Sequence, residues 1–143
     1  MWISTKGKNA VKVMIDLGMY ATGDPIKVKD IARRQDISEK YLEQIISVLS
    51  KTGLVRSVRG AKGGYILNGS PETVTVRMIL EAAEGDISVT DNSSSDMSVN
   101  ITDMVSNKLW DELNAAVGSV IDSVTLADML EWEQNLLVDQ YTI

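Results

Sequence analysis

Cysteine, histidine and phenylalanine are absent from this 143-residue sequence, and proline occurs only twice. Without cysteine there can be no disulfide, no thiolate metal site and no cysteine-held iron–sulfur cluster. Without histidine there is no histidine-based triad and no general base of the usual kind near neutral pH. No Gly-rich phosphate loop or set of metal ligands takes their place. We therefore expect no enzyme, no cofactor and no metal site.

Long apolar runs are missing as well. No stretch approaches the ~18 apolar residues that a membrane-spanning helix requires, and the opening residues lack the apolar core of a signal peptide. A hydrophobic content of 44% still supports a buried core, built from Ile, Val, Leu, Met and Ala in the absence of Phe. The length fits one domain, or one compact domain with an appended element. We expect a cytoplasmic protein without membrane contact.

Charge is distributed unevenly along the chain. Residues 1–65 hold twelve Lys and Arg against six Asp and Glu, a net charge of +6, whereas residues 66–143 hold two against fourteen, a net charge of −12. Because salt screens electric fields beyond roughly 8–10 Å, local potential rather than the acidic total decides what binds. The basic half can lie on phosphate while the acidic half points away from it. A chance clustering of solvated charges is the alternative.

The order of predicted elements in the first 85 residues is that of a winged helix-turn-helix. Apolar spacing predicts helices at 4–20, 27–35 and 39–51, then two short strands around a turn at 60–64. A helix at 75–84 follows, then a long helix at about 107–122 and a short one near 126–137, which a Thr125/Asp128 capping box opens. We predict a mainly α fold with a small β-hairpin (α+β). Its parts are a winged helix-turn-helix DNA-binding domain at 1–85, a polar loop at 86–106, and a dimerisation helix with the C-terminal segment at 107–143.

The helix predicted at 39–51 has an outer face suited to DNA. Gln44 can pair with adenine, Glu43 can accept from the cytosine amino group, and Lys40 can reach guanine or a phosphate in a major groove. Tyr41, at the flank of this face, would hold the DNA backbone. An ordinary solvated helix face is the alternative.

The predicted hairpin carries Arg56, Arg59 and Lys62 on or near a tip of small residues. Small residues let the backbone approach DNA closely, and Arg59 can enter a narrow A·T minor groove. A requirement of the turn for positive φ is the simpler reason for the glycines. At the start of the first helix, Thr5 and Lys6 can clamp a phosphate together with free backbone amides. Simple helix capping is the alternative there.

The long predicted helix carries an apolar stripe that a single wing domain has no surface to cover. Packing against a second copy would cover it, so we expect a homodimer that binds a near-palindromic DNA site. Packing of the stripe on its own wing domain is the alternative. The residues expected at the dimer interface are Leu109, Trp110, Leu113, Val117, Val120 and Ile121.

Together these motifs resemble the Rrf-type family of bacterial winged-helix transcriptional regulators. The resemblance rests on segments 4–7, 37–44, 53–55, 57–65, 109–110 and 123–126. It implies a homodimeric DNA-binding regulator, usually a repressor, whose long C-terminal helix crosses between subunits. It also implies base contacts from Ser38, Lys40, Tyr41, Glu43 and Gln44, a wing contact from Arg59, and phosphate contacts from Thr5 and Lys6.

One departure from the family pattern bears on the signal. Cluster-binding members carry three cysteines before the Leu-Trp pair, and the corresponding positions here hold Asn92, Ser98 and Met104, with Asn107 at a fourth ligand position. Because these groups cannot replace soft, anionic thiolates, we expect a regulator without an iron–sulfur cluster. A regulatory protein or a small-molecule effector could act on the loop at 86–106, or the loop is merely solvated. The rival function is a winged-helix protein-interaction module that regulates a partner protein rather than DNA.

Overall fold

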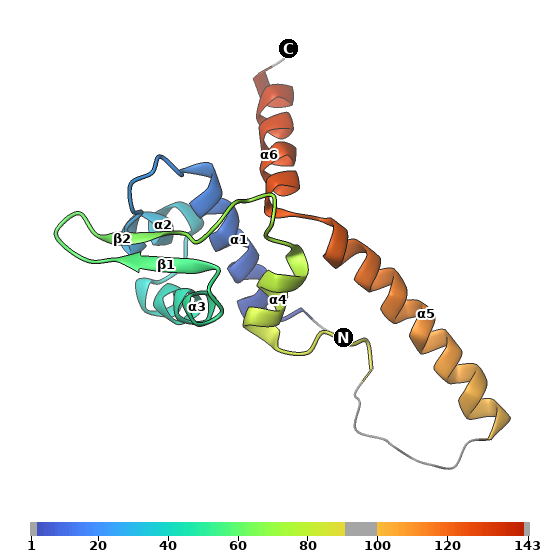
Figure 1. The fold of residues 1–143 in the computed structure, drawn as a ribbon. Coiled ribbons are helices and arrows are strands. Elements are labelled where there is room, and N and C mark those ends of the chain that lie inside the picture. The colour runs from blue at the N-terminus through green and yellow to red at the C-terminus, as the bar shows by residue number, and fades with distance from the viewer. Residues whose placement is uncertain (1–2, 91–99, 142–143) are drawn as a thin grey trace.

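The computed structural model of the chain describes residues 3–90 and 100–141. Its elements are α1 (Thr5–Met19), α2 (Val28–Gln35), α3 (Glu39–Lys51), β1 (Val55–Val58), β2 (Gly64–Leu67), α4 (Val76–Glu84), α5 (Ile101–Ser123) and α6 (Leu126–Tyr141). The elements from α1 to α4 form a body, from which α5 and α6 extend in different directions (Figure 1). The predicted class, mainly α with a small antiparallel hairpin in a winged helix-turn-helix, is confirmed.

Two caps define the turn between α2 and α3. Helix α2 is capped at its carboxy end by Asp36, whose φ of 52° is left-handed. The Ile37 N–H donates to the Ala32 carbonyl at 3.0 Å. Aspartate tolerates this conformation better than most residues that carry a side chain. Helix α3 begins after Ser38, whose hydroxyl accepts from the Tyr41 N–H at 3.2 Å. These caps fix the direction in which α3 leaves the turn.

The core fixes which face of α3 is turned outward. Leu42, Ile45, Ile46 and Leu49 are at most 1% exposed, as the apolar spacing predicted. They pack in one cluster with apolar residues of α1, α2, α4 and the first turns of α6. Because one side of α3 is buried completely, its polar residues are left on the solvent side.

One charged residue lies inside this core. Asp16 has no exposed surface, and its carboxylate accepts from Nε and Nη2 of Arg34 at 2.9 and 2.8 Å and from Gln35 at 2.8 Å. The hydrogen bonds to Asp16 raise the pKa of the Arg34 guanidinium above its ordinary value. Arg34 also stacks over the Tyr20 ring, 3.9 Å from its centroid. A buried carboxylate with three donors is fully satisfied, so this network holds the end of α2 against α1.

The wing is anchored to the loop before α2. Strands β1 and β2 pair antiparallel, with Val55 opposite Leu67 and Val58 opposite Gly64. Ile26 adds a bridge to β2, through hydrogen bonds of 2.9 and 2.8 Å with Tyr65. The sequence did not predict this bridge, because one residue between Pro25 and a helix shows no strand pattern. The bridge ties the base of the hairpin to the body.

Helix α5 is longer than predicted. It begins at Ile101 rather than near residue 107, because the Asn100 side chain caps it by accepting from the Asp103 N–H at 2.8 Å. The last residues of the predicted loop at 86–106 are therefore helical. None of the described helices combines the length and the apolar character that a bilayer crossing requires.

The junction between α5 and α6 is fixed to the body. The predicted capping box is confirmed, since the Thr125 N–H donates to Asp128 at 2.9 Å and the Asp128 N–H donates to Thr125 at 3.1 Å. Backbone hydrogen bonds from Val76 to Val124 (2.9 Å) and from Leu126 to Val74 (2.8 Å) join this corner to the segment before α4. Helix α6 then runs to Tyr141, past the predicted end near residue 137.

Candidate nucleic-acid interface

The predicted base-reading residues lie on the solvent side of α3. Lys40, Glu43 and Gln44 are exposed, whereas Tyr41 is half-buried against the core. Ser38 is exposed at the amino end of the helix, where its hydroxyl serves as the N-cap. The structure therefore brings the predicted reading residues together at the start of one helix. The backbone contact predicted for Tyr41 stays a prediction.

The wing presents three cations without acidic partners. Arg56, Arg59 and Lys62 are exposed, and no acid among the described residues forms an ion pair with them. The tip is closed by a hydrogen bond of 2.9 Å from the Gly63 N–H to the Gly60 carbonyl, and Gly60 has a φ of 115°. The turn itself thus requires Gly60, so the backbone explanation holds at this position. The three cations beside it are open to solvent and free of acidic partners within residues 3–90 and 100–141.

The amino end of α1 is occupied by a carboxylate of its own chain. The Ser4 hydroxyl caps α1 by accepting from the Gly7 N–H at 3.1 Å, so the capping alternative holds for Ser4. Oε1 of Glu84 accepts from the Ser4 N–H at 3.0 Å and from the Ser4 hydroxyl. Thr5 is exposed and Lys6 is half-buried in the same turn. The spacing of 80 residues between Ser4 and Glu84 hides this contact from sequence analysis.

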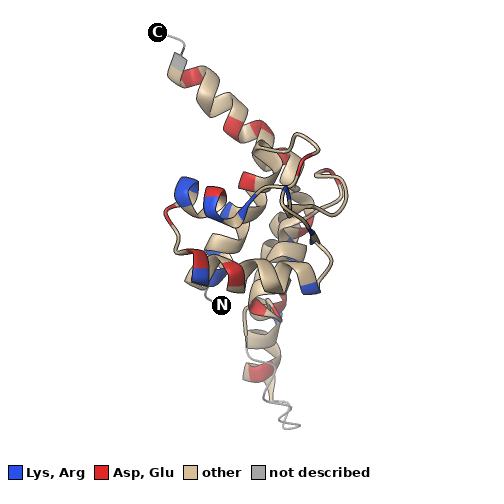
Figure 2. Ribbon diagram, turned by 90° about the vertical axis from the view of Figure 1, so that its left-hand side faces the viewer, with Lys and Arg blue, Asp and Glu red and all other residues tan. Residues whose placement is uncertain are grey.

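The separation of charge along the sequence is also a separation in space. Lys and Arg gather on the helices and loops of the body, whereas α6 carries acidic residues and no basic ones (Figure 2). Some of these charges have acidic partners within the chain: Arg34 is paired with the buried Asp16, Arg33 with Asp30 and Arg77 with Asp122. The exposed charges of α3 itself are mixed, since Glu39 and Glu43 lie beside Lys40, so the net positive charge of the candidate surface comes from the wing.

Helix α5 has two apolar faces, not one. Ile121 is only 7% exposed and packs with Leu80 and Ile87 of its own chain, and Val117 is half-buried beside them. Ile121 therefore leaves the predicted dimer interface, and for this part of the stripe the intrachain alternative is correct. The physical reason is that the segment after α4 returns to cover α5. The sequence gives no sign of this return.

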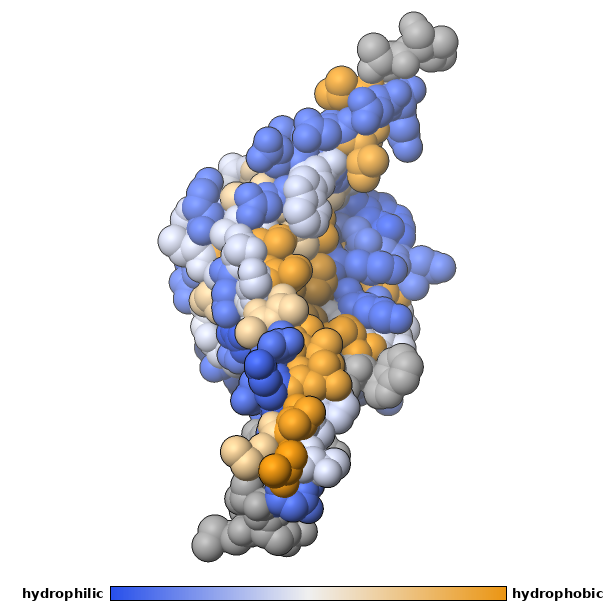
Figure 3. Space-filling model, turned by 90° about the vertical axis from the view of Figure 1, so that its right-hand side faces the viewer, coloured by the Kyte–Doolittle hydropathy of each residue, from blue (hydrophilic) through white to orange (hydrophobic). Residues whose placement is uncertain are grey.

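The second face of α5 is open to solvent. Its apolar side chains form a band along the α5 side of the molecule (Figure 3). Leu109, Leu113 and Val120 of the predicted interface lie there, and Trp110 at its edge is 37% exposed. Ile101 and Val105 extend the band toward the amino end of α5, at 79% and 66% exposed. Sequence analysis missed both because it placed them in the loop, although Asn100 before Asp103 was a capping signal.

An ion pair holds α5 against α4. The Arg77 guanidinium donates to both oxygens of Asp122, with Nη2 at 3.1 Å from Oδ2, and Nη1 reaches Glu81 at 3.4 Å. The hydrogen bond from Arg77 lowers the pKa of Asp122 below its ordinary value. The Val89 N–H donates to the Asn114 side chain at 2.7 Å, which adds a second tie to α5. The inner face of α5 is thus fixed to the body by polar as well as apolar contacts.

The residues at the family's cluster positions do not fit an iron–sulfur cluster. Asn92 and Ser98 lie outside the described residues, and Met104 and Asn107 are exposed on α5. The chain has no cysteine and no histidine. Residues 3–90 and 100–141 contain no group of three acids that could hold a metal ion instead. No role is therefore derived through iron.

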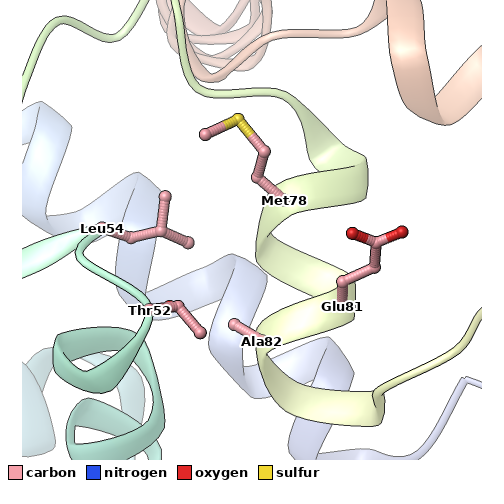
Figure 4. Close-up of a pocket in the computed structure, with 5 residues that line it drawn as sticks. All are labelled: Thr52, Leu54, Met78, Glu81 and Ala82. Atoms are coloured by element: carbon pink, nitrogen blue, oxygen red, sulfur yellow. The ribbon is translucent and has the colours of Figure 1, made fainter.

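A shallow cavity lies near the carboxy end of α3. It has a volume of about 240 Å³ and lies between the end of α3, the start of β1 and α4 (Figure 4). Its lining residues are Thr52, Leu54, Met78, Glu81 and Ala82. None of its lining residues belongs to the loop predicted at 86–106, where an effector could act. It offers mainly apolar contact and few polar groups to orient a ligand.

Comparison with known proteins gives consistent matches over nearly the whole chain. The Rrf2 family model, described as "Iron-dependent Transcriptional regulator", matches residues 3–132. The HTH-type transcriptional regulator CymR of Bacillus subtilis (strain 168) is 37% identical over 132 residues, 92% of this chain and 91% of that protein. The HTH-type transcriptional regulator IscR of Aliivibrio salmonicida (strain LFI1238) is 35% identical over 130 residues, 91% of this chain and 77% of that protein.

Solved structures show the same likeness. The structure of CymR (YrzC), the global cysteine regulator of B. subtilis, superposes with a TM-score of 0.81 at 36% identity, covering 92% of this chain and 98% of that chain. The structure of T. potens IscR gives a TM-score of 0.73 at 42% identity, covering 92% of this chain and 87% of that one.

Proposed function

The chain belongs to the Rrf2 family of transcriptional regulators, and we propose that it binds a near-palindromic DNA operator as a homodimer, without an iron–sulfur cluster, and represses transcription from it. The observation that carries this proposal is the surface made by α3 and the wing. Long polar side chains are exposed at the start of α3, a helix that packs against strand β1 of the wing. The wing carries three exposed cations that have no acidic partner among the described residues. The residues proposed to touch DNA are Thr5, Lys6, Ser38, Lys40, Tyr41, Glu43, Gln44, Arg56, Arg59 and Lys62.

The parts of this surface have different tasks. An exposed helix face of this length can enter a major groove, where Gln44 and Glu43 discriminate between bases by hydrogen bonding. Arg59, near the wing tip, enters the neighbouring minor groove, where it responds to groove width rather than to base edges. Thr5 and Lys6 contact phosphate and so set the register of the protein on the duplex without reading sequence.

The open face of α5 supports the homodimer. Burying apolar surface contributes about 25 cal/mol per Å², and a band of exposed Leu, Val and Ile along several helical turns is a poor surface to leave in water. A second copy offers the same band, and a two-fold axis then places two α3 helices on successive turns of one DNA face, about 34 Å apart or a small multiple of that. The dimer residues proposed are Leu109, Trp110, Leu113, Val117 and Val120, joined by Ile101 and Val105.

The absence of thiolates supports regulation without a cluster. The test is anaerobic reconstitution of the purified protein with iron and sulfide. We expect no stoichiometric visible-absorbing species, because neither thiolate nor imidazole is available. Appearance of such a cluster would refute this part of the proposal.

DNA binding itself is tested by selecting fragments from genomic DNA with the purified chain. We expect recovery of a near-palindrome, since the operator mirrors the symmetry of a two-fold dimer. The rival function, a protein-interaction module, is favoured by the exposed Trp132 and Leu136 on acidic α6. Failure to enrich any sequence, with retention of a partner protein instead, would favour this rival.

A further inference from the structure

Glu84, in the last turn of α4, is held by the amino end of α1. Oε1 of Glu84 accepts from the backbone N–H of Ser4 at 3.0 Å and from the Ser4 hydroxyl. Gly7, three residues further along α1, is buried, and a Cβ atom at this position would overlap the same Oε1. The absence of a side chain at residue 7 therefore makes room for the carboxylate.

The electrostatics of the two helices favour this arrangement. The amino end of a helix carries partial positive charge from its unpaired N–H groups, and the carboxy end carries partial negative charge. A carboxylate in the last turn of α4 is therefore disfavoured by its own helix and stabilised by α1. The first turn of α1 gains a fixed anchor.

The anchored turn has an inner and an outer side. Ser4 and Gly7, three residues apart, contact Glu84 on the side toward α4. Thr5 and Lys8, also three residues apart, are exposed on another side, and Lys6 is half-buried between them. The carboxylate thus holds the turn from within and does not cover the side that faces solvent.

We propose that Glu84 is a positioning residue for DNA binding, which holds the first turn of α1 so that Thr5 and Lys6 meet a phosphate. This inference rests on the proposed function, because it presupposes that this turn touches DNA. The same turn is connected to α5, since Ile3 packs on the cluster formed by Leu80, Ile87 and Ile121. The proposed phosphate contact therefore lies on a turn that contacts α4 and packs near α5, the helix proposed to form the dimer.

Two variants release the anchor in different ways. Glu84→Ala removes the carboxylate. Gly7→Ala keeps the negative charge but displaces it, because the overlapped atom is the end of a flexible side chain. Alanine is also the better helix former, so the substitution does not weaken helix α1 itself, although its Cβ comes within 3.2 Å of the Ile3 side chain. The melting temperature of Gly7→Ala is therefore measured beside that of the parent. Glu84→Gln retains Oε1 as an acceptor for both Ser4 donors.

The measurement is fluorescence anisotropy of a labelled operator duplex at several salt concentrations. We expect Glu84→Ala and Gly7→Ala each to weaken binding about 5- to 10-fold and to reduce the salt slope by about one phosphate contact. Glu84→Gln should remain within about twofold of the parent, as should Glu131→Ala, which removes an exposed carboxylate from α6. Lys6→Ala should add no further loss in the Glu84→Ala background, since the contact is already lost.

Each other outcome decides against the inference. Parent-like or tighter binding by Glu84→Ala and Gly7→Ala would show that Glu84 does not position the contact, and additive losses with Lys6→Ala would show the same. A parent that binds no duplex would overturn the proposed function as well. Unchanged variants of a DNA-binding parent would overturn this inference alone.

Discussion

The cations of the amino-terminal half have very different surroundings. Arg34 is committed to the buried Asp16, and Arg33 lies 3.7 Å from Asp30 on the surface of α2. Arg59 has no acidic partner among the described residues. A cation that is already paired gains less from a phosphate than one that is not. The number of Lys and Arg in the sequence therefore overstates the number of cations that are available to DNA. We expect the wing cations to contribute more to DNA binding than their number suggests.

Replacing Arg59 with alanine should weaken operator binding by about 1–3 kcal/mol. The loss should be larger when the sequence under the wing is A·T-rich, because narrow minor grooves concentrate negative potential. The loss of affinity is measured by titrating both proteins with operators that differ only in the base pairs under the wing. Lys108→Ala, which removes an exposed cation from α5, is the matched control and should bind like the parent. Equal binding by the Arg59 variant and the parent would remove the wing from the interface.

Replacing Gln44 with alanine should relax sequence preference at a single base pair. A bidentate contact to adenine contributes about 1–3 kcal/mol of discrimination, which truncation abolishes. The measurement is the affinity for a series of operators, each changed at one position, with the other positions serving as internal controls. An unchanged profile would show that Gln44 does not read a base.

At the scale of elements, α5 has one face packed on its own chain and one face exposed. One face is fixed to α4 by the Arg77–Asp122 pair and by burial of Ile121, and the other exposes Leu113. Leu113→Asp should convert the dimer to monomers, because a carboxylate desolvated at a two-fold axis meets its own copy. We expect dimer dissociation to become at least about 100-fold easier, from a penalty of several kcal/mol. Analytical ultracentrifugation over a range of concentrations measures it.

Ala115→Asp is the control for this change. It adds the same charge on an exposed turn of α5, away from the apolar band. The control should remain dimeric at concentrations where Leu113→Asp is monomeric. A dimeric Leu113→Asp variant would place the subunit contact elsewhere.

The Arg77–Asp122 ion pair between α4 and α5 should make the stability of the fold depend on pH in the acid range. Arg77 lowers the pKa of Asp122, so the pair stabilises the fold above the ordinary aspartate pKa. This stabilisation is lost as the pH falls through the lowered value. The difference in melting temperature between the parent and Asp122→Asn should therefore be constant near neutral pH and should shrink only in strong acid. A difference that changes between pH 6 and 8 would contradict this assignment.

The elements that sequence analysis predicted are those fixed by local rules. The apolar spacing of α3, its Ser38 cap and the Thr125/Asp128 box each depend on residues within a few positions, and all three occur as predicted. Three other contacts join segments that are distant in sequence: the Ile26 bridge, the burial of Ile121 and the Glu84 contact. Such contacts produce no periodic pattern in the sequence, so sequence analysis did not predict them. The early start of α5 belongs between these cases, because its Asn100 cap is local but lies in a polar stretch without apolar spacing.

At the scale of the molecule, the uneven distribution of charge along the sequence places basic and acidic residues in different parts of the structure. Lys and Arg lie on the helices and loops of the body, while acidic α6 extends away from it (Figures 1 and 2). In the proposed dimer, joining two copies through α5 would combine the basic halves of both chains. The net charge of −6 for the whole chain does not oppose DNA binding, because the local potential of a surface decides what binds there.

The salt dependence of operator binding, measured together with the stoichiometry of the complex, tests the central claim most directly. We expect two chains per near-palindromic duplex, and a logarithm of affinity that falls linearly with the logarithm of salt concentration, with a slope of about −0.9 for each phosphate contacted. One chain per duplex, or an affinity for the selected sequence that does not change with salt, would contradict it.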